Sequence, residues 1–145
     1  MRERWIGSIR GRGPGCRLSR DGPRRAEWLG DPSFESAGRV RRQLQAALIR
    51  WGLGDEVVED AALVVGELLA NAVVHARTPF RLSARLQGPL LHVSVSDHRV
   101  GAPEALAVNP TAGRVSGLRL ITAVAFRWGW QEHETGKTVW AELIL

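Results

Sequence analysis

The chain has 145 residues, of which 44% are hydrophobic and 24% charged, which matches one globular domain with a single core. No apolar run approaches the roughly 18 residues that span a bilayer, so we expect no membrane segment. The single cysteine, Cys16, excludes an internal disulfide and a thiolate-rich zinc site, and the four histidines lack metal-ligand spacing.

The excess positive charge of the chain lies in residues 1–25. The formal net charge is +5, and this segment holds eight arginines against two acids, a net charge of +6 that leaves −1 for the rest. The segment is rich in Gly and Arg and lacks periodicity, so we expect a basic, disordered tail before one domain over residues 26–145. The tail is either a solvated extension or an arm for an acidic partner or nucleic acid. No apolar block follows its arginines as in a secretory signal, so we expect a cytoplasmic protein.

The first elements expected are a short edge strand and a helix. Trp28 and Leu29 can begin the strand, and Pro32 with the following serines offers the chemistry of a helix start. The helix is expected to run to about Trp51, because apolar residues recur at intervals of three and four. Its buried face is expected to hold Val40, Leu44, Ala47, Leu48 and Trp51.

A second, longer helix is expected from Asp55 to about Ala76. Asp55 can cap it, and the acids in its first turns suit the positive end of the helix dipole. Thr78 and Pro79 then stop the helix.

Two hairpins and a third helix complete the expected order. Segments 80–87 and 90–97 alternate apolar and polar residues around a Gly-Pro turn, which predicts a hairpin whose apolar face ends in Asp97. A long loop, a third helix over 116–127 and a second hairpin from 128 to 145 follow. The predicted fold class is α/β: a two-layer sandwich in which a mixed, mostly antiparallel sheet is covered on one face by about three helices.

The second helix carries a polar stripe within an apolar run. In "GELLANAVVHA", the residues Glu67, Asn71 and His75 recur every four positions and share one face, which meets either water or a ligand. An Asn oxygen is a hard ligand suited to Mg²⁺, and a Glu carboxylate can activate a hydroxyl or a water. Taken alone, Glu67 and Asn71 fit a solvated stripe equally well.

Three further signals follow along the chain. Asp97 ends a core-facing strand in "DHRVG", where a carboxylate can accept the exocyclic amine of adenine. "GRVSGL" opens a helix that can present N–H groups to phosphates, and "GKT" enters the last strand. Each signal has an ordinary alternative, since Asp97 can form a turn, Ser116 can cap a helix and "ETGK" can be a hairpin turn. Their order along the chain favours one common ligand.

The stretches "ELLANAVVHA", "GLRLITAVAFRWGW" and "GKTVWAEL" resemble the single-domain ATP-binding regulators related to bacterial anti-sigma factor serine kinases. That family belongs to the gyrase, heat-shock-chaperone and histidine-kinase ATPase superfamily, with the Bergerat fold, and the resemblance covers about residues 28–145. It implies a histidine-kinase-like ATPase domain that binds ATP and Mg²⁺. It also implies sequestration of a sigma factor and phosphorylation of Ser or Thr on an anti-anti-sigma partner.

The resemblance implies roles for individual residues as well. Glu67 would be the general base, and Asn71 would bind the Mg²⁺ that bridges the phosphates. Asp97 would recognise adenine, with Gly101 in its motif and Thr138 near the base. The glycine motif at the end of the ATP lid would comprise Gly113, Ser116, Gly117 and Leu118.

Two glycine positions of the family are replaced in this chain. Arg99 stands at the first glycine of the usual Asp-x-Gly-x-Gly, and Val115 stands at the first glycine of the usual Gly-x-Gly-Leu. Val cannot readily adopt a positive φ or let a phosphate approach as closely as Gly, whereas Arg99 could pair with a phosphate or fill the pocket. We therefore expect the two replacements to affect catalysis more than adenine recognition.

Three hypotheses about function follow. The first is an ATP-binding regulator of the anti-sigma factor type, with kinase activity undecided, whose partner is a sigma factor, an anti-anti-sigma factor or both. The second is a non-catalytic protein-interaction module with weak or lost nucleotide binding. The third is nucleic-acid binding confined to the basic tail. The resemblance leaves open whether the protein forms a homodimer, and it implies no membrane partner.

Overall fold

The computed structural model describes residues 3–6, 24–103 and 117–145. Its strands and helices are β1 (Glu3–Ile6), β2 (Arg24–Gly30), α1 (Phe34–Arg50), α2 (Asp55–Ala70), β3 (Phe80–Gln87), β4 (Leu90–Asp97), α3 (Gly117–Val124), β5 (Arg127–His133) and β6 (Gly136–Ile144). A π-helical turn, η1 (Asn71–Ala76), continues α2. Among these residues no helix is long and apolar enough to cross a membrane.

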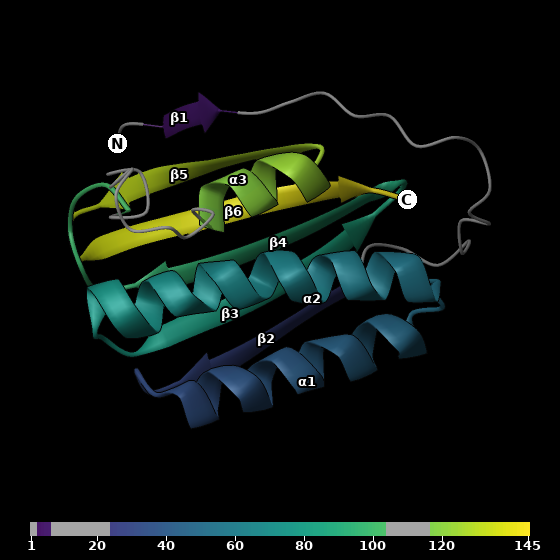
Figure 1. The fold of residues 1–145 in the computed structure, drawn as a ribbon, viewed down its shortest axis with the longest axis horizontal. Coiled ribbons are helices and arrows are strands. Elements are labelled where there is room, and N and C mark those ends of the chain that lie inside the picture. The colour runs from purple at the N-terminus through teal and green to yellow at the C-terminus, as the bar shows by residue number, and fades with distance from the viewer. Residues whose placement is uncertain (1–2, 7–23, 104–116) are drawn as a thin grey trace.

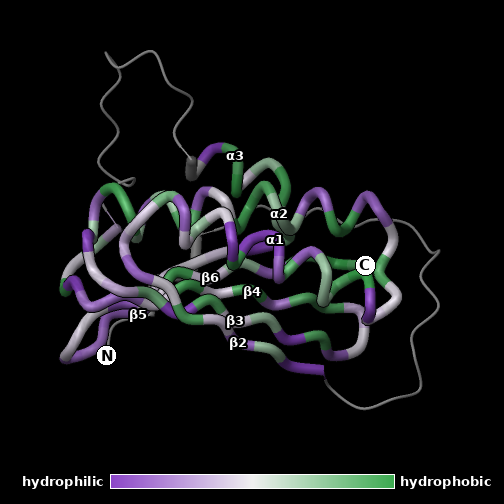
Figure 2. Tube along the Cα trace, turned by 90° about the horizontal axis from the view of Figure 1, so that it is seen from below, coloured by the Kyte–Doolittle hydropathy of each residue, from purple (hydrophilic) through white to green (hydrophobic). Residues whose placement is uncertain are grey.

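The described strands form one antiparallel sheet, and the helices cover one of its faces. The strand order is β1-β5-β6-β4-β3-β2, and every described pair is antiparallel. Figure 1 shows α1, α2 and α3 in front of the sheet, and Figure 2 shows the same two layers from below. The predicted two-layer α/β fold is therefore confirmed.

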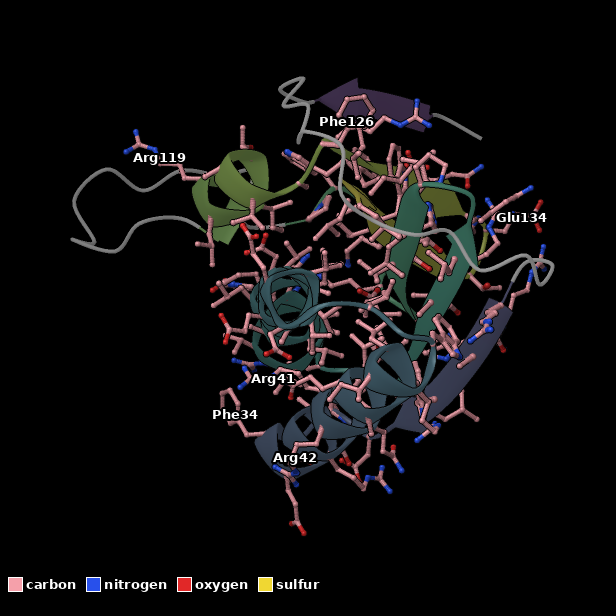
Figure 3. The ribbon with its side chains drawn as sticks, turned by 90° about the vertical axis from the view of Figure 1, so that its right-hand side faces the viewer. Phe34, Arg41, Arg42, Arg119, Phe126 and Glu134 are labelled. Carbon is pink, nitrogen blue, oxygen red and sulfur yellow. The ribbon has the colours of Figure 1, made fainter. Side chains whose placement is uncertain are left out.

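The core lies between these two layers because alternate strand residues point towards the helices. Figure 3 shows side chains filling this space, while Phe34, Arg42 and Arg119 project outward from the helices. α2 packs against both α1 and α3, so its surface is covered on several sides. The buried residues of the strands and of α2 include Leu82, Val93, Val95, Val139, Ala141, Val64, Val65 and Leu68.

The ends of the first two helices show how local sequence sets their boundaries. Ser33 caps α1 by accepting a hydrogen bond from the Ser36 N–H at 3.1 Å, and the four core positions expected from Val40 to Leu48 are buried. Hydrogen bonds from the Ser33 and Ser36 hydroxyls lower the pKa of Asp31 below its ordinary value. The expected cap by Asp55 is wrong, because Gly54 is the cap residue and Asp55 is the first residue of α2.

Two parts of the expected tail are strands. Glu3–Ile6 form β1 and pair with β5, while Arg24 and Arg25 begin β2 at the opposite edge of the sheet. The expectation of disorder does not hold for these residues, and residues 7–23 lie outside the described part. The third helix also ends earlier than expected, because Arg127 already belongs to β5.

The face of the sheet that the helices leave uncovered carries a charged cluster centred on Glu142. Its Oε1 lies 3.2 Å from His92 Nδ1, its Oε2 accepts a hydrogen bond from Arg127 Nε, and the His92 ring stacks on Trp140 at 5.7 Å. Burial raises the pKa of Glu142, but the hydrogen bonds with Arg127 and His92 outweigh burial and lower this pKa overall. The ionised carboxylate therefore joins β4, β5 and β6 on this face.

Replacing Glu142 should reveal a pH-dependent contribution to stability. The folded pKa lies below the ordinary value of 4.5, so the contribution is complete above pH 4.5 and is lost as the pH falls through the folded pKa. Glu142→Gln should lower the free energy of unfolding by about 1 kcal/mol at neutral pH and by progressively less in acid. Urea titrations from neutral pH to about pH 3 measure this difference. Glu134→Gln, at an exposed position on the β5–β6 turn, is the control (Figure 3); a difference for Glu142→Gln that stays constant with pH would contradict the prediction.

Candidate functional site

The polar stripe of the second helix turns towards the protein interior. Asn71 is 7% exposed, whereas Glu67 and His75 are half-buried. The stripe spans the end of α2 and the turn η1, which contacts β4 (Figure 1). A solvated stripe would leave all three residues exposed, so the observed burial does not fit that alternative.

The side-chain oxygen of Asn71 is a buried acceptor without a partner. Within the described residues, Asn71 Oδ1 has no hydrogen bond, and the great majority of buried polar atoms in proteins do have one. The surrounding turn is π-helical, since the Arg77 N–H donates to the Ala72 carbonyl at 2.9 Å across five residues. Such turns are frequent at functional sites. The local geometry thus presents an unused oxygen ligand at the end of the helix.

Glu67 lies one helical turn before Asn71. Its residue is half-buried, and its carboxylate has no hydrogen bond or ion pair within the described part of the chain. Both oxygens are therefore available to a hydroxyl, a water or a metal-bound water.

Asp97 forms a buried ion pair with Lys137. The Lys137 Nζ lies 2.9 Å from Asp97 Oδ2 and 3.0 Å from Oδ1, and each side chain is 2% exposed. The two residues are direct neighbours across β4 and β6. The sequence interpretation missed Lys137, although it shares one face of the last strand with the apolar residues Val139, Ala141 and Leu143 and is therefore expected to face the core.

Gly136 lets the two strands approach closely at this point. A Cβ atom on Gly136 would lie 1.9 Å from the Asp97 carbonyl oxygen and 2.9 Å from the Cα of His98. Both are backbone atoms, which cannot move aside as a flexible side chain would. The absence of a side chain at Gly136 therefore allows the contact between Asp97 and Lys137.

Thr138 lies on the opposite face of the sheet from the Asp97 side chain. Its hydroxyl is 2.7 Å from Ser96 Oγ and 2.8 Å from His133 Nε2, both on the uncovered face. Lys137, and not Thr138, contacts the Asp97 carboxylate, because neighbouring residues of a strand point to opposite faces. The place of Thr138 near a base, which the resemblance implies, stays a prediction.

Arg99 joins the loop after β4 to the end of the helix. Its backbone N–H donates to Asp97 Oδ1 at 2.9 Å, and its guanidinium donates to the His75 carbonyl. Gly101 follows with a φ of 106°, a conformation that favours glycine. Of the remaining predicted residues, Gly113 and Ser116 lie outside the described residues, and Gly117 and Leu118 begin α3.

Two cavities open at this end of the sheet. One, of about 720 Å³, is bounded by both predicted residues Asp97 and Thr138, together with Gly136, His133 and Arg81. The other, of about 490 Å³, is lined by Val74, His75, Ala76, Arg77 and Arg99. The predicted residues of β4 and β6 therefore share a cavity whose lining does not include Glu67 or Asn71.

The residues present fit Mg²⁺ in one respect. A buried amide oxygen with no protein partner is a suitable hard ligand, and Asn71 supplies it. The described residues contain no group of three His, Cys, Asp or Glu side chains placed to hold a metal ion. A cation at Asn71 would therefore depend on oxygens of a bound ligand, as Mg²⁺ commonly does with nucleotide phosphates.

Comparison with known proteins places this geometry in context. Residues 32–143 match a family model described as the histidine kinase-like ATPase domain. No curated protein matches the chain. The crystal structure of the RsbU and RsbW domains of Rv1364c from Mycobacterium tuberculosis is similar, with a TM-score of 0.66 and 20% identity over 84% of this chain. This chain spans 32% of that chain, so the similarity shows a shared fold.

Adding a methyl group at Gly136 should disrupt this end of the sheet. Because the new Cβ would overlap backbone atoms, Gly136→Ala should lower the free energy of unfolding by about 3 kcal/mol or more. Gly38→Ala is the control, since its Cβ would meet only the end of the flexible Arg42 side chain and should stabilise α1 by about 0.5–1 kcal/mol. Denaturant titrations of both variants test the prediction, and equal stabilities would show that the close approach is not required.

Proposed function

Because the chain belongs to the histidine kinase-like ATPase domain family, we propose that it is an ATP-binding regulatory protein of the anti-sigma factor type. The observation that carries the proposal is the buried Oδ1 of Asn71 at the end of α2, which has no hydrogen-bond partner among residues 24–103 and 117–145. An acceptor in such a position costs stability unless a ligand uses it. ATP with Mg²⁺ supplies a cation that an amide oxygen can bind.

Individual roles in this proposal follow from position and chemistry. Asn71 would hold Mg²⁺ on the phosphates, and Glu67, one turn earlier, would orient or deprotonate the hydroxyl that is phosphorylated. Asp97 would accept a hydrogen bond from the base. The N–H groups at the start of α3, near Gly117, would contact phosphate, together with the preceding Gly113 and Ser116.

The proposed partners are a sigma factor, an anti-anti-sigma factor whose Ser or Thr receives the phosphate, or both. Two findings support this proposal: the family of the chain, and a fold shared with a structure that includes an RsbW domain. We place this regulator in the cytoplasm, with residues 24–145 as the ATP-binding domain and Glu3–Ile6 as an edge strand of its sheet.

A second function is favoured by the Asp97–Lys137 ion pair. Asp97 already contacts a cation through both oxygens, and a carboxylate engaged in this way binds a base less readily; on this ground the fold is a protein-interaction module with weak or lost nucleotide binding. Direct measurement of nucleotide binding separates this function from the first.

Removing the Asn71 amide should weaken binding of ATP with Mg²⁺. Loss of an interaction of about 1.5–3 kcal/mol with a charged group predicts an affinity about 10–100-fold lower for Asn71→Ala than for the wild type, measured by titration calorimetry. Val74→Ala, in the same π-helical turn but at an exposed position, should bind as the wild type does. If the wild type binds no ATP at millimolar concentration, the interaction module is the better description.

Removing the Glu67 carboxylate should greatly slow phosphate transfer while leaving ATP binding almost unchanged. With labelled ATP and the cognate anti-anti-sigma protein, Glu67→Gln should lower the transfer rate about 10²–10⁴-fold, the usual effect of losing a general base. Glu59→Gln, two turns earlier on α2 and exposed, is the matched control. Equal rates for Glu67→Gln and Glu59→Gln would exclude a catalytic role for Glu67.

A further inference from the structure

The Asp97–Lys137 ion pair presents a hydrogen-bond acceptor beside a donor. A carboxylate has about four acceptor positions, and three are used here. Lys137 Nζ takes one on each oxygen, at 3.0 and 2.9 Å, and the Arg99 N–H takes a second position on Oδ1 at 2.9 Å. With respect to the described residues, one acceptor position therefore remains on Asp97 Oδ2.

Lys137 retains a weakly used donor. An ammonium group has three N–H donors, and two of them point to Asp97. The third faces the Arg99 carbonyl at 3.5 Å, beyond the usual range of an N–H···O hydrogen bond. This N–H can therefore donate to an acceptor on a bound ligand that lies closer. The free acceptor and the weakly used donor belong to atoms 2.9 Å apart.

Adjacent donors and acceptors also mark the edge of a purine base. Adenine presents an amine donor at position 6 beside a ring acceptor at N1, whereas a 6-oxopurine presents a carbonyl acceptor beside an N1–H donor. A carboxylate alone accepts from the adenine amine and repels a carbonyl oxygen at the same place. A carboxylate with an ammonium beside it can bind either edge. With adenine, the carboxylate accepts from the amine and the ammonium donates to N1; with a 6-oxopurine, the ammonium donates to the carbonyl and the carboxylate accepts from N1–H.

We infer that Lys137 makes the base site tolerant of 6-oxopurine nucleotides, so that the protein binds inosine and guanosine triphosphates in addition to adenosine triphosphate, with similar affinities. The inference rests on the proposed function, in which Asp97 meets the base. Ion pairing also neutralises the carboxylate before the base arrives, since both groups are 2% exposed and at hydrogen-bonding distance. A neutral base then meets a neutral pair, and the negative charge that would exclude a 6-oxo group is compensated.

The test compares ATP with inosine triphosphate, which differ only at the 6-position and its neighbouring ring nitrogen. Calorimetric titration with Mg²⁺ should give wild-type affinities within about tenfold of each other. Lys137→Met has a side chain of similar length without the charge, and it should weaken inosine triphosphate relative to ATP by about 10–100-fold, the effect of one unpaired buried polar group. Lys137→Arg keeps the donor and should preserve the wild-type ratio.

The ratio of the two affinities distinguishes recognition from a structural effect. A partly unfolded variant loses active sites for both nucleotides equally, so the ratio is unaffected by the folded fraction. Wild-type discrimination above about 100-fold against inosine triphosphate, or an unchanged ratio in Lys137→Met, would overturn the inference while ATP binding stands. If neither nucleotide binds the wild type, the proposed function fails and the inference fails with it.

Discussion

The pairing of β4 with β6 is the contact on which the candidate site depends. It brings Asp97 opposite Lys137, forty residues later in the chain, and the close approach is possible because Gly136 has no side chain. Burying two charges is costly, and the cost is offset only when the ions are in good geometry. Here Nζ lies within 3.0 Å of both carboxylate oxygens. The glycine and the ion pair thus require each other, since separating the strands would leave two buried charges uncompensated.

The position of α2 sets its polar stripe apart from the rest of the helix. α2 packs on the sheet and between α1 and α3, so most of its surface is apolar and covered. A polar side chain on such a helix is either exposed at a gap in the packing or buried at a cost. Asn71 is buried without a partner, whereas the acid on the uncovered face, Glu142, is fully engaged by Arg127 and His92. Among the described residues, the buried side-chain atoms without a hydrogen-bond partner are Asn71 Oδ1 and Trp130 Nε1, and Asn71 supplies the oxygen of the two.

Sequence patterns predicted the elements of the fold better than their register. Alternation gave the first hairpin with its observed bounds and placed Asp97 on the core face, because a strand has a period of two. The partner of Asp97 could not be read in the same way, since pairing across forty residues is a tertiary property. The resemblance named Thr138 as a residue near the base and said nothing of Lys137, the next residue along the strand, which faces Asp97 from the other side of the sheet. The π-helical turn also escaped prediction, because the four-residue spacing of the stripe suits an ordinary helix.

Arg99 illustrates how a replaced glycine can preserve a local arrangement. The turn after β4 uses the Arg99 backbone N–H, which any residue except proline supplies, so the Asp97 carboxylate keeps this hydrogen bond. The guanidinium binds the His75 carbonyl, where the end of a helix leaves acceptors unsatisfied and favours a cation. A glycine would provide the first contact but not the second. In this chain, Arg99 therefore ties the strand that carries Asp97 to the helix that carries Asn71, and the replacement strengthens the connection between the two halves of the proposed site.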